Sequence, residues 1–147
     1  MAYERTIYEN DTKVNAAEVL NKLDQGIYDL FLAIAGEKVW VNEDTTASFA
    51  STTASVNTDK VVTGFEVLFQ TSTTDKSILS TGKVPVGATY CEHSAGHNYY
   101  RPVSVSQDGE TVTIDIGECT RKTISASPAG STQNGYVIPV TIKFFYE

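Results

Sequence analysis

The chain has 147 residues, about the usual size of one domain, and its hydrophobic fraction of 41% is enough to form a core. With 18 acidic against 11 basic residues the net charge is −7, which argues against binding to the phosphates of DNA or RNA. There is no apolar run of 18 residues and no signal-peptide pattern at MAYERTIYEN. We therefore expect that the protein is synthesised in a cytoplasm and does not insert into a membrane.

Residues 1–13 mix aromatic and charged side chains without a period, which is typical of an extended arm. Such an arm has too little apolar surface to order itself. We therefore expect Tyr3, Ile7 and Tyr8 to pack on a neighbouring chain, and a frayed terminus is the alternative.

A helix is predicted next, from Val14 to the residue before Gly36. Asn15 and Glu18 have the spacing of a capping box, and Gly36 is the residue type that most readily ends a helix in the left-handed conformation. Gly26 lies inside this helix and lowers its stability by about 1 kcal/mol relative to alanine, which close packing of another backbone would offset.

Apolar residues recur along this helix at alternating intervals of three and four, which places them in one stripe. The stripe consists of Ala16, Leu20, Leu23, Ile27, Leu30 and Ile34. Its partner is either a coiled-coil seam with copies of the same chain or the sheet of its own β domain. Isoleucine and leucine at alternating seam positions favour two strands in an isolated coil. The run LFLAIA after Asp29 is apolar on nearly every face, so we expect this half to be enclosed.

The remainder reads as β structure. KVWVN is a short strand, and the Ser/Thr/Ala-rich segment 43–60 is either an exposed strand, alternating from Ala47 onward, or a solvated linker. Residues 61–71 predict a central strand with Phe65, Val67 and Phe69 on one face. Two short strands are expected between residues 77 and 90, around Gly82, Pro85 and Gly87.

Two further strands flank Asp108-Gly109, a pair that readily adopts the positive φ angles of a tight hairpin turn. The last strand has Ile138, Val140, Ile142, Phe144 and Tyr146 on one face. Because Pro139 has no N–H, this strand should lie at a sheet edge or bend there. The pattern predicts a mainly β protein: an N-terminal helix followed by an antiparallel β-sandwich or jelly roll. We divide it into an arm and oligomerisation helix, 1–36, and a β-sandwich domain, 37–147.

Candidate chemistry is sparse. Cys91, His93, His97 and Cys119 are residue types that bind zinc, but their spacing fits no standard finger. The preferred interpretation is an ordinary loop with thiols, no metal, no cofactor and no catalytic site, so we expect no enzyme activity.

Aromatic residues suggest a second kind of site. Trp40, Tyr99 and Tyr100, with Tyr90, are candidates for a surface that binds sugar rings. This is the basis for an alternative function as a carbohydrate-binding module. The competing interpretation, in which these aromatics cover the core or a subunit interface, is the more common one.

The N-terminal third resembles the corresponding region of many bacteriophage tail, fibre and head-appendage proteins. The resemblance rests on Tyr3-Glu-Arg-Thr and Tyr8-Glu-Asn, followed by Asn15-Ala16, Leu20-Asn21-Lys22 and Gly26-Ile27 at the start of a helix. It covers about 35 residues, and the β domain adds only a generic similarity to variable appendage domains.

The resemblance implies a virion structural protein. In that reading the helix assembles copies, a homotrimer rather than a dimer, through Leu20, Leu23, Ile27, Leu30 and Ile34. The arm anchors them to capsid or tail proteins, and the β domain faces outward, where such domains commonly bind host surfaces or glycans. At 147 residues the chain lacks a long fibre shaft, so it would be a short spike, head fibre, decoration protein or adaptor.

Overall fold

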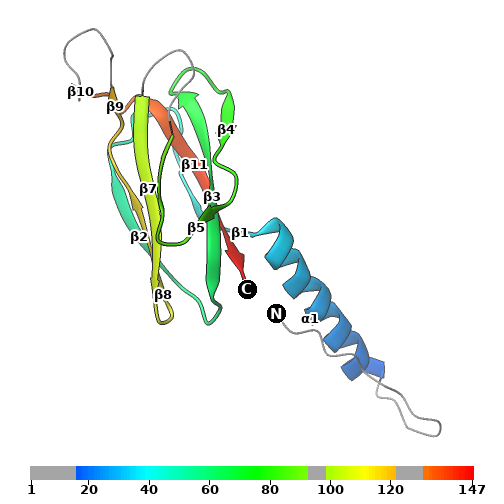
Figure 1. Cartoon of the computed structure of the whole chain (residues 1–147). Coiled ribbons are helices and arrows are strands. Elements are labelled where there is room, and N and C mark those ends of the chain that lie inside the picture. Colours follow the sequence, from blue (N-terminus) through cyan, green and yellow to red (C-terminus); the bar gives the residue numbers. More distant parts are fainter. Residues whose placement is uncertain (1–15, 93–98, 122–130) are drawn as a thin grey trace, which may run out of the picture.

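The computed structural model describes residues 16–92, 99–121 and 131–147. They form one helix, α1, followed by two antiparallel sheets packed face to face (Figure 1). The first sheet has the order β1-β11-β3-β4, with β5 also pairing with β3. Its strands are β1 Glu37–Val41, β3 Val62–Ser72, β4 Ile78–Ser80, β5 Val84–Pro85 and β11 Tyr136–Tyr146.

The second sheet has the order β10-β9-β7-β8-β2, with β6 also pairing with β7. Its strands are β2 Thr52–Asn57, β6 Thr89–Glu92, β7 Tyr99–Asp108, β8 Thr111–Ile116, β9 Thr120–Arg121 and β10 Ser131–Thr132. The predicted mainly β fold with an N-terminal helix and an antiparallel sandwich is confirmed.

The core lies between the sheets, where alternate residues of each strand meet. Phe65, Val67 and Phe69 of β3 are fully buried, as the alternation predicted, and β3 is central in its sheet. Opposite them, Val103 and Val105 of β7 are fully buried as well. Strands β7 and β8 form the predicted hairpin. Its turn contains Gly109, whose φ is 59°, a value that a residue without Cβ adopts without strain.

The Ser/Thr/Ala-rich segment forms both structures that the sequence allowed. Residues 42–51 are an irregular connection, and β2 begins only at Thr52, later than the alternation from Ala47 suggested. Within β2, Ala54 and Val56 are half-buried against the core while Thr53 and Ser55 are exposed. The strand lies at an edge of the second sheet, next to β8.

Strand β11 corrects the prediction for the end of the chain. It is flanked by β1 and β3, so it is not an edge strand, and the alternative, a bend near Pro139, is what occurs. A bulge between Pro139 and Thr141 moves Pro139 opposite the core residue Phe69, and Ile138 opposite Gln70. Ile138 therefore leaves the face of Ile142, and the prediction of one continuous face is wrong.

The missing N–H of Pro139 is tolerated because β1 has ended beside it. β1 stops at Val41, opposite Thr141. The next residue, Asn42, donates its backbone N–H to Val140 O at 2.9 Å and its side-chain Nδ2 to Pro139 O at 2.9 Å. A side chain thus replaces the strand neighbour at this position.

Arg101 is fully buried on β7 although it is charged. Its Nε donates to Val137 O at 2.7 Å, and its two terminal nitrogens donate to the carbonyls of Ala50 and Gly117 and of Phe49 and Tyr136, at 2.7–3.3 Å. Burial lowers the pKa of Arg101 to about 10, so it stays protonated at neutral pH. This side chain joins the connection before β2, the end of β8 and the start of β11.

Helix α1 spans Ala16–Ala35. Val14 and Asn15 lie outside the described residues, so the proposed start of the capping box is not seen. The predicted stop is confirmed, since Gly36 has a φ of 75° and donates its N–H to Leu32 O at 3.1 Å. From this residue the chain enters β1, and α1 points away from the sandwich (Figure 1).

Candidate functional site: the free face of the helix

The apolar stripe of α1 is uncovered. The exposed fractions of its side chains are 59% for Leu20, 43% for Leu23, 66% for Ile27, 49% for Leu30 and 72% for Ile34. On the same helix Tyr28 and Phe31 are 50% and 58% exposed. Large exposed apolar residues elsewhere in the described part of the chain are scattered singly on the sandwich, at Val41, Val61 and Ile78. A contiguous patch of this kind marks an interaction surface.

The sandwich contacts α1 on the side away from this stripe. Leu32 is 4% exposed and joins the core, and Asp29 forms an ion pair with Lys60, Oδ1 to Nζ, at 3.3 Å. At about 100° per residue, Leu32 and Asp29 lie roughly 140–160° around the helix from Ile27. The alternative in which the stripe packs on the sheet of its own domain is therefore wrong for this chain.

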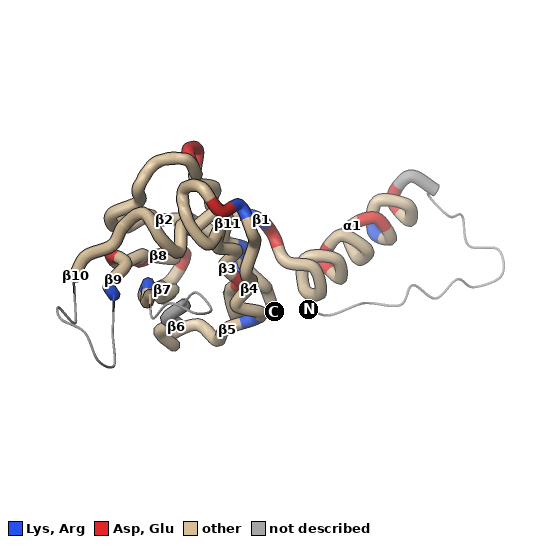
Figure 2. Tube along the Cα trace, turned by 90° about the horizontal axis from the view of Figure 1, so that it is seen from above, with Lys and Arg blue, Asp and Glu red and all other residues tan. Residues whose placement is uncertain are grey.

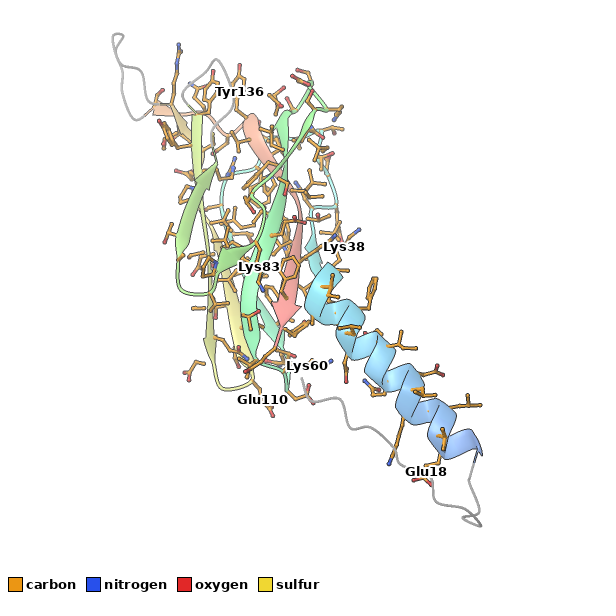
Figure 3. All side chains as sticks on the ribbon, turned by 45° about the vertical axis from the view of Figure 1, so that its right-hand side comes forward. Glu18, Lys38, Lys60, Lys83, Glu110 and Tyr136 are labelled. Carbon is orange, nitrogen blue, oxygen red and sulfur yellow. The ribbon has the colours of Figure 1, made fainter. Side chains whose placement is uncertain are left out.

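The second half of the helix is also less enclosed than the run LFLAIA suggested. Phe31 and Ile34 remain largely exposed, and Leu32 is the large side chain of this run that enters the core. Figure 3 shows why, since side chains project from α1 where no part of the sandwich lies beside them. Within a single chain this surface has no partner among the described residues.

Charge is absent from the stripe and gathers on other sides of α1. Figure 2 shows acidic and basic positions along the helix, which are Glu18, Lys22, Asp24 and Asp29. Helical geometry places Glu18, Lys22 and Asp29 opposite the stripe, and Asp24 beside it. The free face is therefore suited to an apolar partner.

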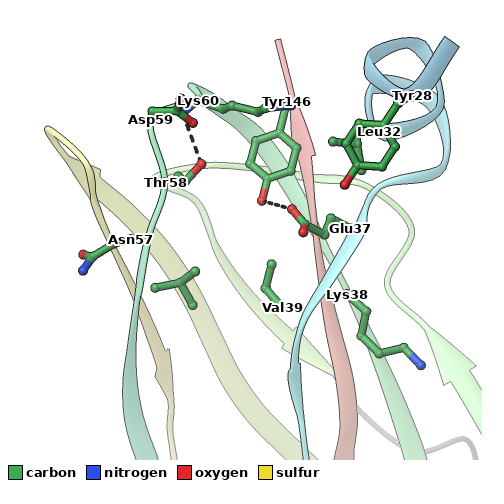
Figure 4. A pocket seen from close by; sticks show the side chains of 11 residues that line it. Tyr28, Leu32, Glu37, Lys38, Val39, Asn57, Thr58, Asp59, Lys60 and Tyr146 are labelled. Atoms are coloured by element: carbon green, nitrogen blue, oxygen red, sulfur yellow. Dashed lines mark hydrogen bonds between the residues drawn. The ribbon is translucent and has the colours of Figure 1, made fainter. Parts of the chain in front are cut away.

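A groove of about 470 Å³ lies where α1 meets the sandwich (Figure 4). Lys60 Nζ lies 5.7 Å from the ring centre of Tyr28 and 5.7 Å from that of Tyr146, and it also pairs with Asp29. Tyr146 Oη donates to Glu37 Oε2 at 2.7 Å. These contacts, made from α1, β1, β11 and the connection before β3, hold the helix in its direction.

The titratable groups of this groove are shifted by their neighbours. Burial, and then the hydrogen bond to Glu37, raises the pKa of Tyr146. A hydrogen bond from Gln25, whose Nε2 lies 2.8 Å from Asp29 Oδ1, and then the contact with Lys60, lower the pKa of Asp29. Each shift favours the protonation state already present at neutral pH, so both groups serve as fixed structural partners.

The three aromatic residues predicted for sugar binding do not form one surface. Trp40 pairs across the strands with Ile142, is half-buried against the core and contacts Phe49 edge to face with ring centres 5.9 Å apart. Tyr99 lies in the other sheet, is 6% exposed and stacks on Tyr136 with ring centres 4.0 Å apart. Tyr100 is half-buried, on the opposite side of β7 from Tyr99.

The cysteine and histidine candidates are only partly described. Cys119 is fully buried, and burial raises the pKa of its thiol, which keeps it protonated and unreactive. His93, His97 and the side chain of Cys91 lie outside the described residues. In the described part of the chain no three His, Cys, Asp or Glu side chains come together to hold a metal. The arm residues Tyr3, Ile7 and Tyr8 also lie outside it.

The chain matches no protein-family model. Comparisons with curated proteins and with solved structures also return no match. Among the described residues, α1 does not combine the length and the hydropathy that a membrane span requires.

Proposed function

We propose that this protein is a structural component of a bacteriophage particle: a short, non-enzymatic appendage that assembles as a homotrimer through α1. The observation that carries the proposal is the uncharged apolar stripe from Leu20 to Ile34, exposed along the helix and turned away from its own sandwich. Such a surface is stabilised when copies of the helix bury it against one another.

The remaining parts of the chain receive their roles from the N-terminal resemblance. The arm with Tyr3, Ile7 and Tyr8 would attach the assembly to capsid or tail proteins, placing it in the virion. The sandwich would project outward as a short spike, head fibre, decoration protein or adaptor, available to a host surface. A carbohydrate site built on Trp40 and Tyr99 receives no support, because these side chains are committed to the core.

The breadth of the apolar surface supports three helices over two. Val19, Gly26 and Ala33 flank the stripe on one side and Phe31 on the other, so the apolar face is wider than the narrow seam of a two-stranded coil. In a trimer each helix faces two neighbours and buries such a broad face. This outweighs the preference for two strands that the seam residues show by themselves.

The mass in solution tests this proposal. Sedimentation equilibrium or light scattering of the full chain should give three times the chain mass of 16.0 kDa. The double variant L23N/I27N should dissociate to monomers with a folded sandwich, because polar side chains at the centre of the stripe remove the apolar burial that drives assembly.

The matched control is V61N/I78N, which replaces two exposed apolar residues of the sandwich. It should leave the trimer intact. A monomer at high protein concentration, or a trimer that L23N/I27N does not change, would overturn assembly through α1.

A further inference from the structure

The exposed Phe31 and the half-buried Gly26 lie on opposite flanks of the stripe. The seam residues form two rows: Leu20, Ile27 and Ile34 are the first, and Leu23 and Leu30 are the second. Gly26 immediately precedes Ile27 of the first row, and Phe31 immediately follows Leu30 of the second. They are five positions apart in the sequence, which is about 140° around the helix, so Phe31 cannot cover Gly26 of its own chain.

A neighbouring helix brings these two positions together. In a parallel coiled coil, the position just before a first-row residue on one helix lies beside the position just after a second-row residue on the neighbouring helix. The second position is about five residues further along the sequence. Gly26 and Phe31 have this spacing. In an antiparallel pair, like flanks meet instead, and Phe31 would face Phe31 while Gly26 faced Gly26.

Size complementarity supports the pairing. Phe31 presents a large ring that is 58% exposed and has no place in the sandwich, and Gly26 is the residue of α1 with no side chain to obstruct it. Asp24 is the charged residue on the flank of the stripe that carries Phe31. In the parallel arrangement it lies beside Val19 of the neighbour, so no pair of like charges opposes the arrangement.

The stripe offers a substantial area. The exposed parts of Phe31 and the five stripe residues amount to an area on the order of 600 Å² per helix, which a trimer divides between two neighbours, compared with the roughly 800 Å² that each partner buries in a standard two-chain interface. The sandwich occupies the opposite side of α1, so neighbouring helices have access to this surface.

We propose that the assembled helices are parallel and in register, and that Phe31 of each copy packs over Gly26 of its neighbour. This rests on the proposed assembly through α1 and adds to it the orientation of the chains and the residue pair that fixes their register. It also accounts for a glycine in the middle of a helix.

Cross-linking tests the orientation. The double variant G26C/F31C, treated with a short bis-maleimide, should give covalent trimers, because each chain joins both of its neighbours. The single variants G26C and F31C should give no product beyond that of the unchanged chain, whose own cysteines set the background. K22C/Q25C, on the outer side of α1, is the matched control and should also show only background.

The outcomes separate this inference from the proposed function. Strong cross-linking of F31C alone indicates antiparallel helices and overturns the inference, as does a trimeric G26C/F31C protein that gives only background. A monomeric unchanged chain overturns the proposed function itself. If the largest cross-linked product is a dimer, the Gly26–Phe31 contact is retained and the assembly has two helices instead of three.

A second set of variants does not depend on cysteine chemistry. G26L should weaken association at least tenfold, although leucine is more apolar and a better helix former than glycine, because it occupies the space of the Phe31 ring. Adding F31A should restore part of the loss. If G26L strengthens association, or if the two changes are additive, the proposed contact does not exist.

Discussion

At the scale of single residues, Arg101 shows how backbone carbonyls accommodate a buried charge. Among the described residues its hydrogen bonds go to five backbone carbonyls in three separate segments of the chain. A guanidinium has five N–H groups in a fixed plane, which suits such a ring of acceptors. The ring of Phe49 lies 5.2 Å from its central carbon and adds a cation–π contact.

Replacing Arg101 by lysine should lower the free energy of unfolding by about 3 kcal/mol, because three donors on one nitrogen leave buried carbonyls without partners. Urea denaturation followed by circular dichroism measures this loss. R121K, which changes an exposed arginine on β9, should stay within about 0.5 kcal/mol of the unchanged chain. Equal effects of the two substitutions would show that the carbonyl contacts of Arg101 contribute little.

At the scale of elements, the ends of α1 and β1 decide where the helix points. Gly36 combines a left-handed backbone with a tight environment, since a Cβ placed there would lie 3.0 Å from Phe144 O and 3.1 Å from the ring of Phe145. The helix therefore stops directly against β11. This contact, with Leu32 and Asp29 one to two turns earlier, fixes which side of α1 meets the sandwich.

The substitution G36A should lower the free energy of unfolding more than G82A does. Both glycines have positive φ, 75° and 64°, so alanine adds strain of roughly 1–2 kcal/mol at each. A Cβ at Gly82 meets nothing within 4 Å, whereas at Gly36 it crowds β11. We expect G36A to lose at least about 1 kcal/mol more than G82A in thermal or chemical unfolding. Similar losses would mean that β11 moves aside without penalty.

At the scale of the whole molecule, the helix and the sandwich are connected by the groove around Tyr146 and Lys60. Its contacts combine an ion pair, a tyrosine–carboxylate hydrogen bond and cation–π geometry. Together with the buried side chain of Leu32, these contacts connect α1 to β1 and β11. The molecule therefore presents its free helical face in a defined direction, as an assembly element requires.

This connection should make stability depend on pH in the alkaline range. The folded state raises the pKa of Tyr146, so its contribution is fully present below the unfolded pKa of about 10 and is lost as the pH rises above that value. Urea midpoints measured from about pH 8 to pH 11 should fall more steeply for the unchanged chain than for Y146F. Parallel curves would show that the Tyr146 hydroxyl is not coupled to folding.

The local features of the chain were largely predictable from the sequence. The spacing of Leu20 to Ile34 predicted α1, the alternation of Phe65, Val67 and Phe69 predicted a buried strand, and Asp108-Gly109 predicted the hairpin. These patterns are readable because a helix or strand repeats its side-chain directions over a few residues. Gly36 could be recognised for the same reason, since a helix end requires a specific backbone conformation.

What only the tertiary structure decided involves residues far apart in the chain. Pairing across the sheet placed Pro139 in an interior strand and shifted Ile138 to the other face, and five distant carbonyls made Arg101 a core residue. The packing of Leu32 and Asp29 on the sandwich decided which side of α1 stays free. Sequence periodicity describes the directions of neighbouring side chains. It does not determine which other element each face packs against, because that depends on how the strands are arranged in three dimensions.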